Sequence, residues 1–138
     1  MTELNGTVYK KVMIIDDSET DRYVGERNIK KYGFAEEVIT KETANNGLAY
    51  LKSLELTPDE LPELIFLDIR MPELDGFGFL EEYEKLPDVI RKHCIVMMLT
   101  SSLNAEDHEK AKNNRYVKRF LNKPLNKETL QLISSEPK

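Results

Sequence analysis

Three short apolar runs of this sequence each end in a carboxylate or a hydroxyl, and a lysine follows farther along the chain. These residues are Asp16 and Asp17 after residues 12–15, Asp68 after 64–67, Thr100 after 94–99, and Lys123 before Pro124. If the runs are parallel strands, their carboxyl ends meet at one edge of a sheet, and these side chains converge there. Carboxylates gathered in a partly desolvated cleft repel one another unless a positive charge lies among them. The pattern therefore predicts a cation site.

A hard divalent cation is the simplest answer to that repulsion. Mg²⁺ prefers oxygen ligands, keeps several waters, and needs only one or two carboxylates, a backbone carbonyl and an incoming phosphate. The single cysteine, Cys94, argues against zinc. Beside Mg²⁺, Asp68 is placed to attack phosphorus as a nucleophile, while Thr100 and Lys123 each contact a phosphoryl oxygen. Phosphoryl transfer of this kind depends on positioning and charge neutralisation, and an ionised carboxylate needs no general base.

The elements that must position these residues alternate along the chain. The apolar runs are typical of central strands covered on both faces, and two more polar segments, 37–40 and 117–121, are expected nearer the sheet edges. Stretches compatible with helices separate them, at about 19–32, around Leu48 to Leu54, around Phe77 to Tyr83, at 105–114 and at 126–134. This order predicts an α/β fold: a doubly wound, five-stranded parallel sheet in three αβα layers.

Several helix ends carry capping signals. Two segments have an N-cap residue followed three positions later by an acid: Ser18 with Asp21, and Asn104 with Asp107. Gly33 suits the left-handed position that ends the first helix. Residues 57–60, Thr-Pro-Asp-Glu, predict an N-cap at Thr57, a proline at the first helical position and a capping acid. We therefore expect one additional helical turn before residue 64.

Length and composition limit the classes of protein. With 138 residues and 40% hydrophobic content, we expect one domain over 1–138, with a core at about 11–133 and no output domain. The net charge of −5 argues against nucleic-acid binding. There is neither a signal-like leader nor an apolar run long enough for a membrane span, and one cysteine cannot form an internal disulfide. These features predict a cytoplasmic protein.

As a set, the site residues resemble those of the receiver domain of two-component response regulators, a family with a flavodoxin-like, CheY-like sheet. The resemblance is carried by Asp16-Asp17, Asp68-Ile69-Arg70-Met71-Pro72 with Gly76, Ala44 to Gly47, Thr100-Ser101, and Phe120 three residues before Lys123-Pro124. It implies a single-domain response regulator that accepts a phosphoryl group from a sensor histidine kinase or a histidine phosphotransfer protein. Such a chain is not an enzyme beyond its own phosphorylation and dephosphorylation.

The resemblance assigns the phosphoacceptor and the metal ligands residue by residue. Asp68 accepts the phosphoryl group and also contacts Mg²⁺. Asp17 is a direct Mg²⁺ ligand, and Asp16 acts largely through water. The backbone carbonyl of Arg70 completes the protein ligands.

The resemblance also implies how a signal leaves the site. Thr100 and Phe120 match the family's switch pair, in which the hydroxyl moves toward the phosphoryl group and the ring turns inward. Lys123 pairs with phosphoryl oxygens, and its bond to Pro124 is cis. The output surface comprises the helix 105–114, the strand 117–121 and the helix 126–134. It binds a downstream protein that the sequence does not identify, with the chain a monomer or a phosphorylation-dependent homodimer.

Two features depart from the family pattern. Tyr116-Val117 stands where receivers commonly have Gly-Ala, which leaves the shape of the output surface open. The interval between Asp17 and Asp68 is longer than usual, with the excess expected in 53–61.

Two other functions are weighed against phosphorylation. A phosphate-independent interaction module is expected to have lost an acid, the threonine or the lysine, and this chain retains all of them. A phosphohydrolase with an aspartate nucleophile needs a second acid two residues later, where Arg70 stands.

Overall fold

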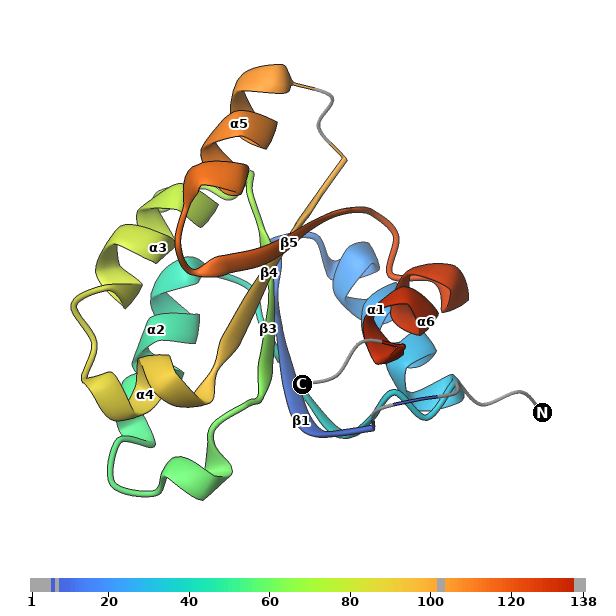
Figure 1. Cartoon of the computed structure of the whole chain (residues 1–138), viewed down its shortest axis with the longest axis horizontal. Helices are drawn as coiled ribbons and strands as arrows, with labels where there is room; N and C mark the ends of the chain where they lie inside the picture. The colour runs from blue at the N-terminus through green and yellow to red at the C-terminus, as the bar shows by residue number, and fades with distance from the viewer. Residues whose placement is uncertain (1–5, 7, 102–103, 136–138) are drawn as a thin grey trace.

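The chain forms one parallel sheet between two layers of helices in the computed structural model, which describes residues 6, 8–101 and 104–135 (Figure 1). The strands pair in the order β2-β1-β3-β4-β5. Their bounds are β1 (Tyr9–Ile15), β2 (Ala35–Lys41), β3 (Leu64–Asp68), β4 (Ile95–Thr100) and β5 (Val117–Asn122). This order confirms the expected doubly wound sheet, and the strand order reverses between β1 and β3.

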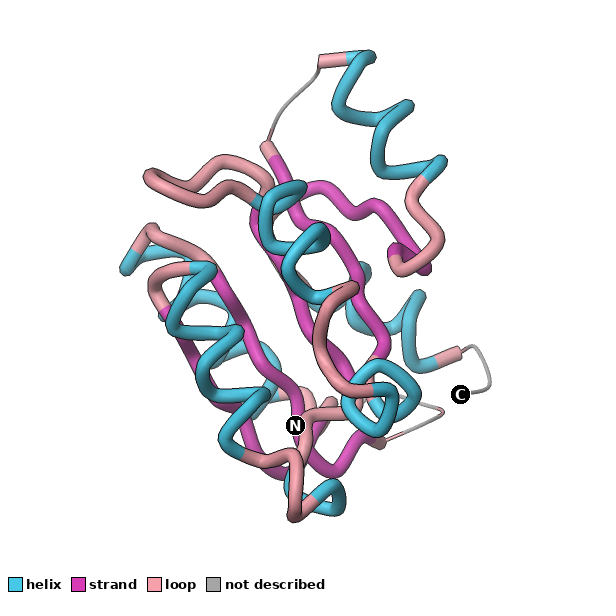
Figure 2. The backbone as a smooth tube through the Cα atoms, turned by 90° about the vertical axis from the view of Figure 1, so that its left-hand side faces the viewer, coloured by secondary structure: helices cyan, strands magenta, loops and turns pink. Residues whose placement is uncertain are grey.

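Helices cover both faces of this sheet. Their bounds are α1 (Glu19–Lys31), α2 (Ala44–Ser53), α3 (Gly76–Tyr83), α4 (Asp88–His93), α5 (Ala105–Asn113) and α6 (Lys127–Ser134), with a 3₁₀ turn η1 (Pro58–Glu60). Figure 1 shows α1 and α6 on one side, and α2, α3, α4 and α5 on the other. Figure 2 views the sheet from the side of the second group, with α2, α3 and α4 in front of the strands. Among the described residues, no helix has both the length and the apolar character that spanning a bilayer requires.

Each side of the sheet has its own hydrophobic core, and β1 contributes to both. Val12 and Ile14 pack with residues of α1 and α6, whereas Met13 and Ile15 pack with residues of α2 and α3. All four are almost fully buried. Residues 12–15 are therefore apolar without alternation, because neither face of a central strand contacts solvent.

The first strand starts three residues earlier than the sequence pattern predicts. Lys10 and Lys11 interrupt the apolar pattern at this start. A polar residue in a buried strand needs a hydrogen-bond partner, and the sequence does not identify one. The Lys11 ammonium finds one by donating a 2.6 Å hydrogen bond to the backbone carbonyl of Glu60. The other strand ends agree with the expected positions to within two residues.

The short helix α4 is absent from the sequence prediction. It buries only Ile90, so it has no apolar stripe to identify it. Arg91 fixes the helix by donating to the Leu86 carbonyl at 2.9 Å and to the Tyr116 hydroxyl at 3.3 Å. The Tyr116 ring meets Tyr83 edge-on, with ring centroids 5.3 Å apart. The residue that departs from the family pattern therefore packs α4 and α3 against the start of β5.

The capping predictions are correct at three positions and wrong at one. The Ser18 hydroxyl accepts from the Asp21 backbone N–H, and the Asn104 side chain accepts from the N–H of Asp107. Gly33 has a φ of 67°, as expected for the residue after α1. The turn η1 is present, but the Thr57 side chain makes no capping bond. The Thr57 carbonyl instead accepts from Glu60 N–H at 2.9 Å, which is sufficient to close a single 3₁₀ turn.

Gly76 marks the closest approach between α3 and the end of β3. A Cβ atom at this residue would lie 2.7 Å from the carbonyl oxygen of Asp68 and 3.0 Å from Cα of Ile69. Both atoms belong to the backbone, so no side-chain rotation relieves the clash. At Gly78, a Cβ would meet side-chain atoms alone: Leu74 Cδ1, at less than van der Waals distance, and Asp75 Oδ1 at an ordinary contact distance of 3.5 Å.

We therefore expect Gly76→Ala to lower the free energy of unfolding by about 1–3 kcal/mol, the usual range for an overpacked site. Gly78→Ala serves as the matched control. It should leave stability within about 1 kcal/mol of wild type, because Leu74 can rotate and alanine favours a helix. Urea unfolding followed by circular dichroism measures both. Equal stability of Gly76→Ala and wild type would contradict this packing argument.

Candidate functional site

The candidate site lies at the carboxyl ends of the central strands, where the strand order reverses. Asp16 directly follows β1, while Asp68 and Thr100 are the last residues of β3 and β4. All three are buried, with exposed fractions of 1%, 4% and 1%. Asp17, the next residue after Asp16, is exposed. The sheet thus places a buried carboxylate pair beneath a carboxylate that solvent reaches.

The three aspartates form a compact group of hard oxygen donors. One carboxylate oxygen from each of Asp16, Asp17 and Asp68 lies within 4.8 Å of the others. Divalent cations such as Mg²⁺ coordinate this type and number of ligands. The residues therefore fit the cation that the sequence predicts.

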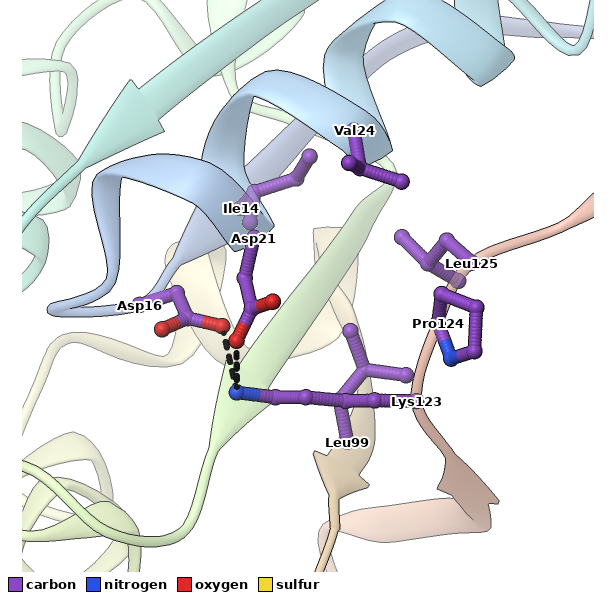
Figure 3. A pocket seen from close by; sticks show the side chains of 8 residues that line it. All are labelled: Ile14, Asp16, Asp21, Val24, Leu99, Lys123, Pro124 and Leu125. Atoms are coloured by element: carbon purple, nitrogen blue, oxygen red, sulfur yellow. Dashed lines mark hydrogen bonds and ion pairs between the residues drawn. The ribbon is translucent and has the colours of Figure 1, made fainter.

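Lys123, the residue that follows β5, extends its side chain into the same group of aspartates. Its ammonium lies 2.8 Å from both Asp16 Oδ2 and Asp21 Oδ2 (Figure 3). Asp68 Oδ1 is 3.2 Å from the same ammonium. The backbone directs it there, because Lys123 N–H donates to the Thr100 carbonyl at 2.9 Å and so continues the pairing of β4 with β5. The Lys123-Pro124 bond is cis, as expected.

This arrangement changes the acidity of both Asp68 and Lys123. Burial first, and then the charge of Asp16, raise the pKa of Asp68 from 3.8 to about 6, against the opposing effect of Lys123. Burial alone would lower the pKa of Lys123. Hydrogen bonds with Asp16 and Asp21 and the charge of Asp68 outweigh it and raise that pKa above its usual value. The lysine stays charged, and Asp68 is mostly ionised at pH 7.

The two residues expected to form a switch pair lie on neighbouring strands. Thr100 pairs with Asn122 in the β4–β5 register, two residues beyond Phe120. The Phe120 ring is half-buried, and it lies 4.3 Å between centroids from the ring of His108 on α5. Phe120 thus lies between the sheet and α5, where a rotation of its ring would alter the contact with that helix.

Arg70, whose backbone carbonyl the sequence assigns to the metal, also has a side-chain partner. Its guanidinium is exposed and forms an ion pair with the buried carboxylate of Asp107, in the first turn of α5. An open hollow beside this residue is lined by Asp17, Arg70, Met71, Pro72 and Asp75. The loop after Asp68 is therefore in direct electrostatic contact with α5.

Asp21 is the site residue that the sequence reasoning missed. It is identified there only as a capping acid, and a complete capping box would have its carboxylate accept from Ser18 N–H. Ser18 N–H donates instead to Asp16 Oδ1 at 2.9 Å, and the Asp21 carboxylate turns to Lys123. The available signal was its position in the first turn of the expected helix, three residues after the N-cap Ser18, which directly follows the Asp16-Asp17 pair.

The pKa of Asp68 predicts a pH dependence of stability. A carboxyl whose pKa is higher in the folded than in the unfolded chain lowers the free energy of unfolding as pH rises from about 4 to 6. Above that range the whole of this destabilisation is present. In chain stripped of divalent cations, Asp68→Asn should be more stable than wild type by about 1–2 kcal/mol at pH 7 and equal to it near pH 4. Urea unfolding across this range measures the difference. The control Asp59→Asn, at an exposed residue of η1, should show no such trend; a gap for Asp68→Asn that does not change with pH would refute the assignment.

Comparison with known proteins agrees with this geometry. Residues 12–134 match the family described as "Response regulator receiver domain". The protein PilG of Pseudomonas aeruginosa is 38% identical over 122 residues, which cover 87% of this chain and 81% of PilG. Some relatives are much longer: the chain spans 14% of the length of the sensor histidine kinase CheAY of Helicobacter pylori, to which it is 31% identical over 122 residues.

Solved structures share the fold closely. A response regulator receiver protein from Dyadobacter fermentans superimposes with a TM-score of 0.79 at 30% identity, covering 90% of this chain and 94% of that chain. The Mn²⁺-bound form of the response regulator Rcp1 gives a TM-score of 0.68 at 26% identity, covering 91% and 88%. The family match covers most of the chain, and the parallel sheet carries the aspartates at the strand ends. The chain belongs to the response regulator receiver domain family of two-component signalling.

Proposed function

We propose that this chain works as the receiver of a response regulator, accepting a phosphoryl group on Asp68 with Mg²⁺ bound beside it. One observation carries the proposal: the Asp68 carboxylate is buried between the Lys123 ammonium at 3.2 Å and the carboxylates of Asp16 and Asp17. That environment supplies a nucleophile, a fixed positive charge and cation ligands at one point. The phosphoryl donor is a sensor histidine kinase or a histidine phosphotransfer protein, the partner class of receiver domains.

The proposed transfer is a displacement at phosphorus. An Asp68 carboxylate oxygen forms a bond to phosphorus, the donor's P–N bond breaks, and its electron pair goes to the imidazole nitrogen, which takes up a proton. The product is an aspartyl phosphate. Lys123 balances the added charge, and the Thr100 hydroxyl donates to a phosphoryl oxygen. Asp16, Asp17, Asp68 and the Arg70 carbonyl would hold Mg²⁺, which would add positive charge beside the phosphoryl oxygens. The chain acts on itself, so it is not an enzyme toward other substrates.

The proposed output runs through α5, β5 and α6. Aspartyl phosphate adds about two negative charges to the site, enough to shift an equilibrium between two arrangements of these elements. Two contacts support the route to α5: the Arg70–Asp107 ion pair and the packing of His108 against Phe120. Leu132 on α6 is 47% exposed and gives a downstream protein an apolar contact on the same surface.

Phosphorylation is tested with acetyl phosphate and Mg²⁺, followed by intact-mass measurement. We expect wild type to gain the mass of one phosphoryl group, to lose this gain when the cation is chelated, and Asp68→Asn to gain nothing. Asp59→Asn, an exposed aspartate at the opposite edge of the sheet, is the control and should react like wild type. No added mass under any condition would overturn the proposal in favour of a phosphate-independent interaction module.

The switch is tested separately with Thr100→Val, which removes the hydroxyl but keeps the shape of a buried side chain. We expect this variant to accept the phosphoryl group on Asp68, while the amide NMR shifts that phosphorylation causes in α5 and β5 fall to less than half those of wild type. Thr40→Val in the edge strand β2 is the control and should respond like wild type. Undiminished shifts in Thr100→Val would remove Thr100 from the switch.

A further inference from the structure

The Lys123 ammonium contacts carboxylates on two sides of the site, one toward α1 and one toward Asp68. An ammonium group has three protons to donate, and the three carboxylates around Lys123 account for all of them. Asp16 and Asp21 are both at 2.8 Å, whereas Asp68 is at 3.2 Å. The ammonium is thus closer to Asp16, which follows β1, and to Asp21, in the first turn of α1, than to the proposed phosphoacceptor.

Asp21 differs from the other two carboxylates in what else it does. Asp16 and Asp68 belong to the group of acids that fits a cation, and Asp21 does not. A cation bound by that group draws on Asp16 and Asp68 and leaves Asp21 as the carboxylate committed to Lys123. Asp21 is also the most accessible of the three, with 40% of its side chain exposed against 2% for Asp16 and 6% for Asp68.

The environment of the Lys123 side chain strengthens the effect of each nearby carboxylate on the ammonium. The stem crosses a narrow pocket whose apolar walls are Ile14, Val24, Leu99, Pro124 and Leu125 (Figure 3). Only 15% of the Lys123 side chain is exposed. Water therefore screens the ammonium less than it screens a surface lysine, and each nearby carboxylate has a larger effect on its position.

We propose that Asp21 is a positioning residue that holds the Lys123 ammonium on the α1 side of the site and thereby weakens the grip on a phosphoryl group at Asp68. The inference rests on the proposed function, because it concerns the phosphoryl group that Asp68 accepts. A phosphoryl group on Asp68 and the Asp21 carboxylate attract the same Lys123 ammonium from different sides, and their negative charges repel each other. Asp21 thus sets an upper limit on the affinity of the site for phosphoryl oxygens.

Beryllofluoride with Mg²⁺, a mimic of the phosphoryl group, tests this at equilibrium. Asp21→Asn keeps the shape of the side chain and removes its charge, so we expect about three- to ten-fold tighter beryllofluoride binding by ¹⁹F NMR or calorimetry. Asp21→Glu restores the charge and should bind within about two-fold of wild type. In a Lys123→Ala background, Asp21→Asn should give no more than about two-fold tightening, because the effect acts through Lys123.

Glu19→Gln is the matched control, since Glu19 lies in the same first turn of α1, is exposed, and makes no contact with Lys123. It removes the same charge from the helix end and should leave beryllofluoride affinity unchanged. A second readout needs neither cation nor mimic. In protein labelled with ¹⁵N-lysine, Asp21→Asn should shift the Lys123 Nζ resonance, and Glu19→Gln should leave it in place.

The outcomes separate the two proposals. If wild type binds beryllofluoride and Asp21→Asn binds equally or more weakly, the role of Asp21 is overturned and phosphorylation at Asp68 stands. Tightening by Glu19→Gln equal to that by Asp21→Asn would reduce the effect to general charge and also overturn it. If wild type itself neither binds beryllofluoride nor accepts a phosphoryl group, the proposed function fails together with this inference.

Discussion

The balance of charge around Lys123 is the interaction on which the site depends. Two buried carboxylates, Asp16 and Asp68, lie at the ends of adjacent strands, and burial together with the charge of Asp16 raises the pKa of Asp68. One ammonium, delivered from the end of β5, contacts both of them. Without it, the carboxylates of Asp16 and Asp68 would face each other without this counter-charge. The lysine therefore makes the acidic edge of the sheet compatible with a packed core.

The parallel sheet is what brings this charge balance about. Each strand enters at one edge and ends at the other, so residues separated by more than a hundred positions become neighbours at the carboxyl ends. Two hydrophobic cores hold the strands in register, one beneath α1 and α6 and one beneath the remaining helices. Close contact at Gly76 fixes α3 directly against the Asp68 carbonyl. The position of the phosphoacceptor is thus set by packing on both sides of the sheet.

Two helices make matching contributions to the site through acids in their first turns. Asp21 in α1 pairs with Lys123, and Asp107 in α5 pairs with Arg70. Both residues occupy the third helical position, where an acid is expected to complete a local cap. In both cases the carboxylate joins the helix to a cationic side chain of the site. The helix beginnings on opposite sides of the sheet are consequently sensitive to the charge at its edge.

Much of the fold and most of the site could be predicted from the sequence, because both are encoded in local patterns. Unbroken apolar runs identify central strands, and the residues that end them, Asp16, Asp68 and Thr100, meet wherever parallel strands end. What the sequence could not reveal is which partners the side chains choose. The short helix α4, the packing of Tyr116 on Tyr83 and the buried Lys11 each depend on contacts with distant segments. The capping signal identified Asp21, but only the tertiary structure gave its carboxylate to Lys123, because a charged donor 102 residues away binds it more strongly than the neutral N–H of Ser18.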